Sequence, residues 1–441
     1  MWLPATLSLL SLFAQDVPAR SDVPFPASEN KKGLQVQMVD DALSLGIGHA
    51  TLNVLLNGVL LSADGAGETG IPWTHGETVI RVSGAYLAPL DRDIKALSDA
   101  GCAVYLILLG NVTGDAARNA LLLDPDRDEA PRNGYAGFNA HLPAGKAHLA
   151  ALIDFLAARY SGGRFGDDHG HVHGWIVGNE VNSHGHWHSV GPLEVGELTR
   201  RYEAAVRTVH LAATARYKNA RTYISLDHFW GRAFQPEKPK QYVGGRAFIG
   251  AFAKHAKASG DFPWHIAHHP YPENLFDPAF WEDTTATDDL GTPRVTFKNL
   301  RVLGRALAAE ELHFEGESRR VILSEQGFHR PGSEAGETLQ AAAYAAAWKL
   351  VQEMPFIDAF VLHRHVDHSR EGGLRLGLWT HKEGSIATPD RKVLMHRVFE
   401  AAGTDRESEA FAFALGVIGE TNWRDFLAPY RFTAQAQRAP R

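Results

Sequence analysis

The most constraining feature of this sequence is a repeated alternation between short apolar runs rich in β-branched residues and longer amphipathic stretches. Such alternation is typical of strand–helix units that form a parallel sheet. The expected strands span residues 34–37, 49–56, 103–109, 174–177, 222–226, 264–268, 321–324 and 357–362. The expected helices span residues 39–45, 85–100, 143–160, 193–214, 245–258, 295–311, 337–352 and 389–401. This number of units suits a closed (β/α)8 barrel, although an open doubly wound sheet can use the same alternation.

The lengths of the connecting segments favour the barrel. Segments that follow expected helices are short, as at 259–263 and 353–356, whereas those that follow expected strands are long, as at 110–142 and 363–388. Long loops at one end of a barrel mark the face that carries the site. We therefore expect an α/β fold, a single-domain (β/α)8 TIM barrel with long loops on its C-terminal face.

The two ends of the chain add segments outside the barrel. Residues 1–14 are apolar and too short to span a bilayer, which predicts a signal peptide and hence a secreted or periplasmic protein. Residues 15–33 form a lead-in, and 34–403 form the barrel. Residues 404–441 are expected to hold one C-terminal helix and a flexible tail.

Composition and motifs narrow the classes of function. The 44 basic and 51 acidic residues give a net charge of −7 with no basic run, so the chain lacks the electrostatic signature of nucleic-acid binding. The single cysteine, Cys102, rules out an internal disulfide framework and a multi-thiolate metal site. The sequence contains no Gly-x-Ser-x-Gly elbow, no Walker phosphate loop and no dinucleotide-binding fingerprint. We therefore expect no cofactor, no resident metal and no nucleic-acid partner.

Two glutamates stand at the ends of expected strands. Glu180 lies in Gly-Asn-Glu-Val-Asn after the fourth strand, and Glu325 lies in Ser-Glu-Gln-Gly after the seventh. Carboxylates at these positions face each other across the mouth of a barrel. Glycoside hydrolysis needs such a pair, since one carboxyl group protonates the leaving oxygen and the other attacks or stabilises the anomeric carbon.

With these motifs the chain resembles clan A of the glycoside hydrolases, in which an Asn-Glu pair ends strand four and a glutamate ends strand seven. The resemblance covers residues 34–401. It implies a retaining glycosidase with Glu180 as general acid/base and Glu325 as nucleophile. It also implies that Asn179 binds the sugar 2-hydroxyl, and that strand six supplies His269 and Tyr271, with the Tyr271 hydroxyl orienting Glu325.

The chain departs from the clan pattern after the eighth strand. Many clan members carry a tryptophan there, whereas this chain has Val-Leu-His-Arg-His-Val-Asp-His from residue 361. Trp379, in the same loop, is a candidate for the missing sugar platform. Arg364 either pairs with Asp367 or Glu325, or binds an anionic group on the sugar.

Other polar and aromatic side chains follow the same strand ends. Asp227 and Trp230 come after the fifth strand, where they form either a packed turn or a wall of the cleft. The sequence His184-Gly-His186-Trp-His188 suggests either a metal site or hydrogen-bond donors beside Glu180. We favour the second interpretation and count His184 among the substrate-binding candidates, because no acidic residue completes a metal-binding spacing.

These observations predict an enzyme that cleaves glycosidic bonds of an oligo- or polysaccharide through a covalent glycosyl-enzyme, with carbohydrate as its partner. Two alternatives stay open: a barrel that binds carbohydrate without cleaving it, and a metal-dependent hydrolase that uses His184, His186 and His188. Transglycosylation shares the covalent step and is not separated from hydrolysis by sequence.

Overall fold

The computed structural model describes residues 20–27, 30–62, 70–162 and 168–432. The predicted signal peptide lies outside these residues. Within the described part of the chain, no helix has both the length and the apolar character needed to cross a membrane.

The core of the molecule is a closed parallel barrel. Its strands, in order around the barrel, are β1 (Lys32–Gln35), β2 (His49–Leu55), β5 (Ala103–Asn111), β7 (Gly174–Val177), β8 (Arg221–Leu226), β9 (Trp264–His268), β10 (Val321–Gln326) and β11 (Ile357–Leu362). Each strand pairs in parallel with the next, and β11 closes the ring by pairing with β1. The predicted TIM barrel is therefore confirmed. β10 is longer than predicted, so that Glu325 is its penultimate residue instead of following it.

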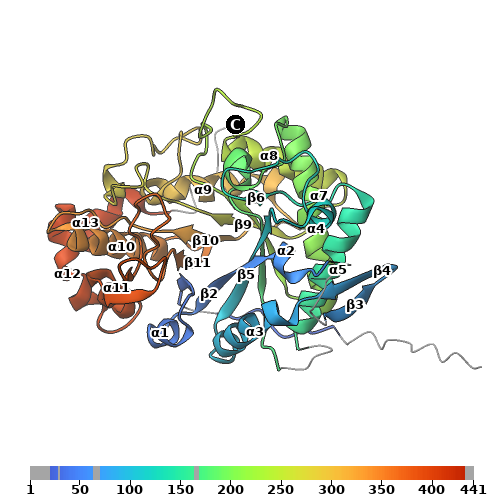
Figure 1. The fold of residues 1–441 in the computed structure, drawn as a ribbon. Coiled ribbons are helices and arrows are strands. Elements are labelled where there is room, and N and C mark those ends of the chain that lie inside the picture. The colour runs from blue at the N-terminus through green and yellow to red at the C-terminus, as the bar shows by residue number, and fades with distance from the viewer. Residues whose placement is uncertain (1–19, 28–29, 63–69, 163–167, 433–441) are drawn as a thin grey trace, which may run out of the picture.

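Helices surround the barrel (Figure 1). Those that connect its strands are α1 (Val39–Ser44), α3 (Gly84–Asp99), α5 (Pro143–Arg159), α7 (Val195–Arg216), α8 (Gly245–Ala258), α9 (Leu300–Leu307), α10 (Gly336–Gln352) and α11 (Leu394–Ala401). The predicted helix over 295–311 is broken, because Thr296 caps a short 3-10 turn, η3 (Phe297–Asn299), and a second one, η4 (Glu310–Leu312), follows α9. The predicted helix over 389–401 begins only at Leu394, because β13 (Pro389–Lys392) pairs with β12 (Trp379–His381).

Several small elements were not predicted. They are α2 (Leu56–Val59), the antiparallel hairpin of β3 (Ile71–His75) and β4 (Thr78–Val82), α4 (Ala116–Leu122), β6 (Tyr135–Ala136), η1 (Val181–Ser183), α6 (His184–Trp187) and η2 (Phe280–Glu282). The C-terminal segment holds α12 (Glu407–Ile418), α13 (Trp423–Leu427) and η5 (Ala428–Tyr430) where one helix was expected. The α12 and α13 helices pack together through Phe411 and Trp423, and α12 covers α10.

The two ends of the barrel differ. Its interior is filled by side chains such as Tyr105, Ile176, Tyr223 and Ile322, which point inward from their strands. At the N-terminal end, Phe25 from the lead-in segment lies against this cluster and closes it. The long loops follow the carboxyl ends of the strands and surround the opposite, open end.

Candidate functional site

Glu180 stands on a strained turn just beyond β7. Gly178 and Glu180 both have left-handed backbones, with φ of 74° and 42°. Glycine is required at 178, since a Cβ there would lie 2.7 Å from Nδ1 of His188. A left-handed glutamate costs on the order of 1 kcal/mol, so neighbouring groups must hold the turn. One of them is Ser225 in β8, whose Oγ accepts the N–H of Glu180 at 2.9 Å.

A buried carboxylate, Asp227, anchors the segment that follows Glu180. Its Oδ1 accepts the side-chain amide of Asn182 at 2.5 Å and the N–H of Phe229 at 2.9 Å, and its Oδ2 accepts the hydroxyl of Ser183. Burial, followed by the charge of Glu180, raises the pKa of Asp227 to about 7. The sequence placed Asp227 among residues that bind substrate. The structure instead engages both of its oxygens within the protein, which makes it a positioning residue for the Glu180 turn.

Glu325 is held by Tyr271, which lies just after the neighbouring strand β9. The hydroxyl of Tyr271 donates to Oε1 of Glu325 at 3.2 Å, which is the contact that the clan resemblance implies. Burial, followed by the charges of Glu325, Glu371 and Glu180, raises the pKa of Tyr271 well above its ordinary value. The hydroxyl therefore keeps its proton and remains a donor.

His269 connects the two glutamate-bearing strands. Its Nδ1 lies 2.9 Å from Oε1 of Glu180, and its Nε2 lies 3.0 Å from Oγ of Ser324, the residue before Glu325. Burial lowers the pKa of His269, but the hydrogen bond to Glu180 and the charges of Glu325, Glu180 and Asp227 outweigh burial and leave the pKa raised. The preceding His268 faces the other way and contacts the carbonyl of Val295 at 3.0 Å, as strand alternation predicts.

The side chains of Glu180, His269 and Glu325 converge. One oxygen or nitrogen atom from each lies within 4.8 Å of those of the other two. Two carboxylates at this separation repel each other when both are ionised. The protein therefore gathers like charges at one point, and it supports them with the hydrogen bonds of His269 and Tyr271.

Arg364 and Glu371 form a second polar group beside the pair. Arg364 Nε lies 3.2 Å from Oε2 of Glu371, and Oε1 of Glu371 lies 2.8 Å from Nε2 of His363. Arg364 therefore pairs with Glu371, and Asp367, one of the two partners suggested by the sequence, pairs with Arg330 instead. Glu371 was not predicted, since it lies in a long loop without periodicity.

Tyr135 is a further residue that sequence reasoning missed. It belongs to β6, which pairs with the end of β5, and it packs against the inward-facing barrel side chains. Burial and the charge of Glu325 raise its pKa, whereas the charge of Arg364 lowers it. The Tyr135 hydroxyl therefore keeps its proton and can donate a hydrogen bond to a ligand.

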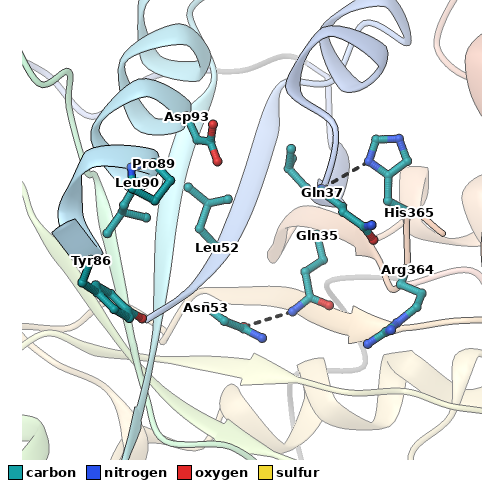
Figure 2. Close-up of a pocket in the computed structure, with 11 residues that line it drawn as sticks. Gln35, Gln37, Leu52, Asn53, Tyr86, Pro89, Leu90, Asp93, Arg364 and His365 are labelled. Atoms are coloured by element: carbon teal, nitrogen blue, oxygen red, sulfur yellow. Dashed lines mark hydrogen bonds between the residues drawn. The ribbon is translucent and has the colours of Figure 1, made fainter. Parts of the chain in front are cut away.

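A cavity of about 480 Å³ opens along the ends of β11, β1 and β2 (Figure 2). Gln35 and Asn53, whose side chains are joined by a hydrogen bond of 3.0 Å, form one edge, and Arg364 forms another. The far wall is the N-terminal half of α3. The cavity does not include Glu180 or Glu325, and Arg364 is the residue that connects it to their surroundings.

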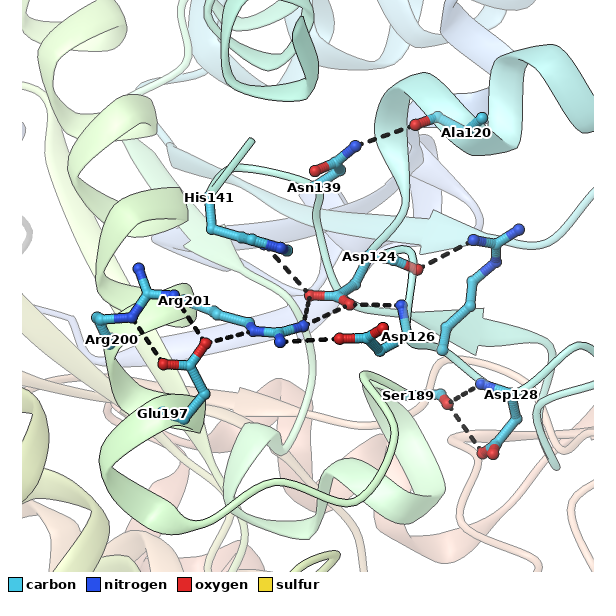
Figure 3. Close-up of polar contacts among 11 residues, drawn as sticks. Ala120, Asp124, Asp126, Asp128, Asn139, His141, Ser189, Glu197, Arg200 and Arg201 are labelled. Carbon is cyan, nitrogen blue, oxygen red and sulfur yellow. Dashed lines mark hydrogen bonds and ion pairs between the residues drawn. The ribbon is translucent and has the colours of Figure 1, made fainter. Parts of the chain in front are cut away.

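A dense ion-pair network fixes the loop that carries Tyr135 (Figure 3). The guanidinium group of Arg201, in α7, contacts Asp124 at 2.9 Å, Asp126 at 2.8 Å and Glu197 at 2.8 Å. Asp124 follows α4 and is completely buried. The network therefore ties the long loop after β5 to the outer helix, and its role is structural.

The histidines at 184, 186 and 188 do not converge. His184 is completely buried, and its Nε2 contacts the carbonyl of Lys240 at 2.8 Å. His186 contacts the hydroxyl of Tyr242 at 2.9 Å, and His188 packs against the ring of Tyr202. Neither the predicted contact of His184 with substrate nor the alternative metal site is supported by this arrangement.

The two tryptophans that were predicted to contact substrate have their indole N–H groups bound within the protein. Trp230 is 2% exposed and donates its indole N–H to the carbonyl of Leu290 at 3.0 Å, so it is a core residue instead of a cleft wall. Trp379 donates its indole N–H to Asp41 at 2.9 Å, and Lys392 stacks on its ring. Its polar edge is thereby fixed to α1.

Asn179 is half-buried beside Glu180. Among the described residues, none forms a hydrogen bond with its side chain. Its amide is therefore available to a ligand that lies next to Glu180.

Comparison with known protein families shows to which family the chain belongs. The family of unknown function DUF5722 matches residues 24–426. The chain belongs to this family. No curated protein matches it.

Three solved glycosidases share this fold at low sequence identity. A family 39 glycoside hydrolase from the gut symbiont Bacteroides cellulosilyticus WH2 is 12% identical, with a TM-score of 0.52 over 86% of this chain and 64% of its own. The hyperthermophilic β-glucosidase from Pyrococcus furiosus is 15% identical, with a TM-score of 0.52 over 86% of each chain. A glucosidase from Croceicoccus marinus is 12% identical, with a TM-score of 0.50 over 87% of this chain and 68% of its own. The chain thus spans less than two thirds of the family 39 enzyme, and the likeness establishes the fold alone.

Proposed function

We propose that this protein is a retaining glycoside hydrolase, with Glu180 as general acid/base and Glu325 as nucleophile. The observation that supports this proposal is the convergence of the two carboxylates at the barrel mouth, within 4.8 Å of each other. Retaining glycosidases place their carboxyl groups about 5 Å apart, whereas inverting enzymes need about 6.5 Å or more to admit a water molecule. The separation therefore favours direct attack by one carboxylate.

The hydrogen bonds are consistent with a separate task for each carboxyl group. His269 holds Oε1 of Glu180, which leaves Oε2 to carry the proton that goes to the bridging oxygen of the substrate. Tyr271 holds Oε1 of Glu325, which leaves Oε2 free to attack the anomeric carbon. The bond from that carbon to the leaving oxygen breaks as the bond to Glu325 forms.

The second half of the cycle reverses these roles. Glu180, now deprotonated, removes a proton from a water molecule that attacks the anomeric carbon of the glycosyl-enzyme. The carbon–oxygen bond to Glu325 breaks, and Glu325 departs as a carboxylate. The sugar leaves with the configuration that it had in the substrate.

A metal-dependent reaction at the same three residues is the principal competitor, because their atoms are close enough to surround an ion. The bonding of His269 argues against it. Both ring nitrogens are engaged, one with Glu180 and the other with Ser324, so neither offers a free lone pair to a metal. We therefore expect activity to survive chelation.

The experiment is a hydrolysis screen over aryl glycosides and polysaccharides with wild type, Glu325→Gln and, as matched control, Glu353→Gln. Glu353 is an exposed glutamate beyond α10. We expect wild type and the control to release sugar with and without EDTA, and Glu325→Gln to lose about 10³-fold in kcat/KM. Full activity of Glu325→Gln would contradict the proposal, and loss of activity with EDTA alone would favour the metal reaction. Sugar binding without any hydrolysis would indicate a non-catalytic binding barrel.

A further inference from the structure

The cavity at the ends of β11, β1 and β2 adjoins the proposed nucleophile. Arg364 follows β11, the strand that pairs directly with β10, which carries Glu325. The charge of Glu371, the partner of Arg364, contributes to the raised pKa of Tyr271, and Tyr271 binds Glu325. Arg364 and Glu371 therefore form a polar surface that borders the cavity and acts on the pair of Tyr271 and Glu325.

The same surface continues to the far side of the cavity. Nδ1 of His363 contacts Oε1 of Gln35, and Nε2 of Gln35 donates to Asn53 at 3.0 Å. These side chains come from β1, β2 and the residue after β11, so hydrogen bonds between neighbouring strand ends fix the cavity edge. A rigid edge next to the nucleophile is suited to a fixed binding subsite.

The position of the cavity relative to the two carboxylates indicates which part of a substrate would enter the cavity. The leaving group must lie beside the acid, Glu180, on the β7 side of the mouth. The sugar that becomes attached to Glu325 lies on the β10 side, and a sugar linked to its other end extends away from Glu180. The part of the cavity that Arg364 and Gln35 line lies in that direction, because β11 and β1 are one and two strands from β10.

The lining chemistry indicates what kind of sugar fits. Asp93 and the side-chain amide nitrogen of Asn53 form no hydrogen bond with any of the described residues, and only Nε of Arg364 is engaged. One acceptor and two donors suit hydroxyl groups, which both donate and accept. Pro89 and Leu90 add an apolar wall on the same face of α3 as Asp93, as Figure 2 shows, and this wall can contact the C–H face of a ring.

The charge of the cavity disfavours an anionic ligand. Glu371 neutralises Arg364, and Asp93 adds a further negative charge. The charge of Arg92 acts on Asp93, so the cavity offers no uncompensated positive charge that would attract a uronic acid or a sulfate. We propose that this cavity binds a second, uncharged sugar unit on the glycone side of the scissile bond, an inference that rests on the proposed function.

The test compares 4-nitrophenyl glycosides of one and two neutral sugar units, each offered as glucose, galactose, mannose and xylose derivatives in both anomeric forms. For the accepted sugar, we expect kcat/KM to be at least tenfold higher for the two-unit substrate. Replacing the distal sugar by its uronic acid should remove this advantage. Equal kcat/KM for both lengths, or preference for the uronic acid, would overturn the proposal. Hydrolysis of neither length would be the failure of the proposed function instead.

Variants of cavity residues test whether the preference for the two-unit substrate arises in the cavity. Pro89→Trp should fill the cavity and lower kcat/KM at least tenfold for the two-unit substrate while leaving the one-unit substrate unchanged. Ala88→Trp is the matched control, because Ala88 is the neighbouring exposed residue of α3 and does not line the cavity. Asp93→Asn, which keeps the shape of the side chain, should lower the two-unit value several-fold. An equal loss on both substrates in the Pro89 and Asp93 variants would contradict the assignment.

Discussion

The two ends of the barrel handle charge in opposite ways. At the N-terminal end, the carboxylate of Asp358 lies between two guanidinium groups, at 3.0 Å from Arg221 and in contact with Arg320. Phe25 stacks beneath Arg221 with 3.8 Å between guanidinium carbon and ring centre. Each of these three charges has a partner of opposite sign, and an aromatic ring covers one of them.

At the mouth, two carboxylates converge instead, and their supporting partners are an imidazole and a phenol. Bringing like charges together costs free energy. Such an arrangement is found mainly at functional sites, where the chemistry needs it. Under the proposed function, the N-terminal end stabilises the fold, and the mouth carries the residues of the reaction. Changes at the mouth should therefore affect activity, and changes at the other end should affect stability.

The largest expected effect is that of Glu180→Gln. Without its acid, the enzyme should lose about 10³-fold in kcat/KM on substrates with poor leaving groups, and much less on activated dinitrophenyl glycosides, which leave without protonation. The unfolding temperature should remain within a few degrees of wild type. Steady-state kinetics across leaving groups checks this. A loss that does not depend on the leaving group would argue that Glu180 is not the acid.

At the opposite end, Asp358→Ala should destabilise the fold. It leaves Arg221 and Arg320 side by side without a counter-charge, and we expect about 3 kcal/mol less free energy of unfolding in urea with unchanged kcat/KM. Asp99→Ala is the control, because Asp99 forms an exposed pair with Lys95 and should change stability by less than about 0.5 kcal/mol. Lost activity in a folded Asp358 variant would contradict the assignment of stability to the N-terminal end and activity to the mouth.

Tyr271→Phe should have a smaller effect on activity. It removes the hydrogen bond to Glu325, and a bond to a charged group contributes about 2 kcal/mol, which corresponds to roughly 30-fold in kcat/KM. Tyr242→Phe, which removes a hydroxyl bonded to His186, is the matched control and should be nearly silent. Equal activity of the two variants would show that the hydroxyl of Tyr271 does not orient the nucleophile.

A further effect, on stability alone, concerns pH and Asp227. Because its pKa is raised to about 7, the folded protein keeps a proton that the unfolded chain releases near its ordinary pKa. Raising the pH from about 4 to about 7 therefore favours unfolding, by at most about 1.4 kcal/mol per pH unit from this residue. Urea unfolding at several pH values should show a shallower fall for Asp227→Asn than for wild type. Parallel curves would mean that Asp227 is ionised throughout.

The barrel was predictable because its strands are buried on both sides. The run Gly174–Val177 has buried residues throughout, and its predicted bounds agree with the structure. The helix expected over 295–311 failed because Thr296 and Asn299 form reciprocal side-chain caps that begin a 3-10 turn, a local contact that apolar periodicity does not report.

The site was predictable only where it follows strands directly. Glu180, His269 and Glu325 stand at strand ends, so topology alone brings them together. Tyr135 and Glu371 reach the same place from within long loops, whose paths depend on tertiary contacts such as the Arg201 network. For Trp230 the sequence left a packed turn and a cleft wall open, because a tryptophan near the mouth fills a loop core as readily as it stacks on a ligand, and the structure shows the packed turn.

The most direct test of the central claim is the stereochemistry of the first product. With the substrate found in the screen, proton NMR recorded within the first minutes of hydrolysis reports the anomeric configuration of the released sugar before it equilibrates. The account predicts retention, because Glu325 lies close enough to Glu180 to attack without an intervening water molecule. Inversion would contradict it and would mean that water, and not Glu325, attacks the substrate.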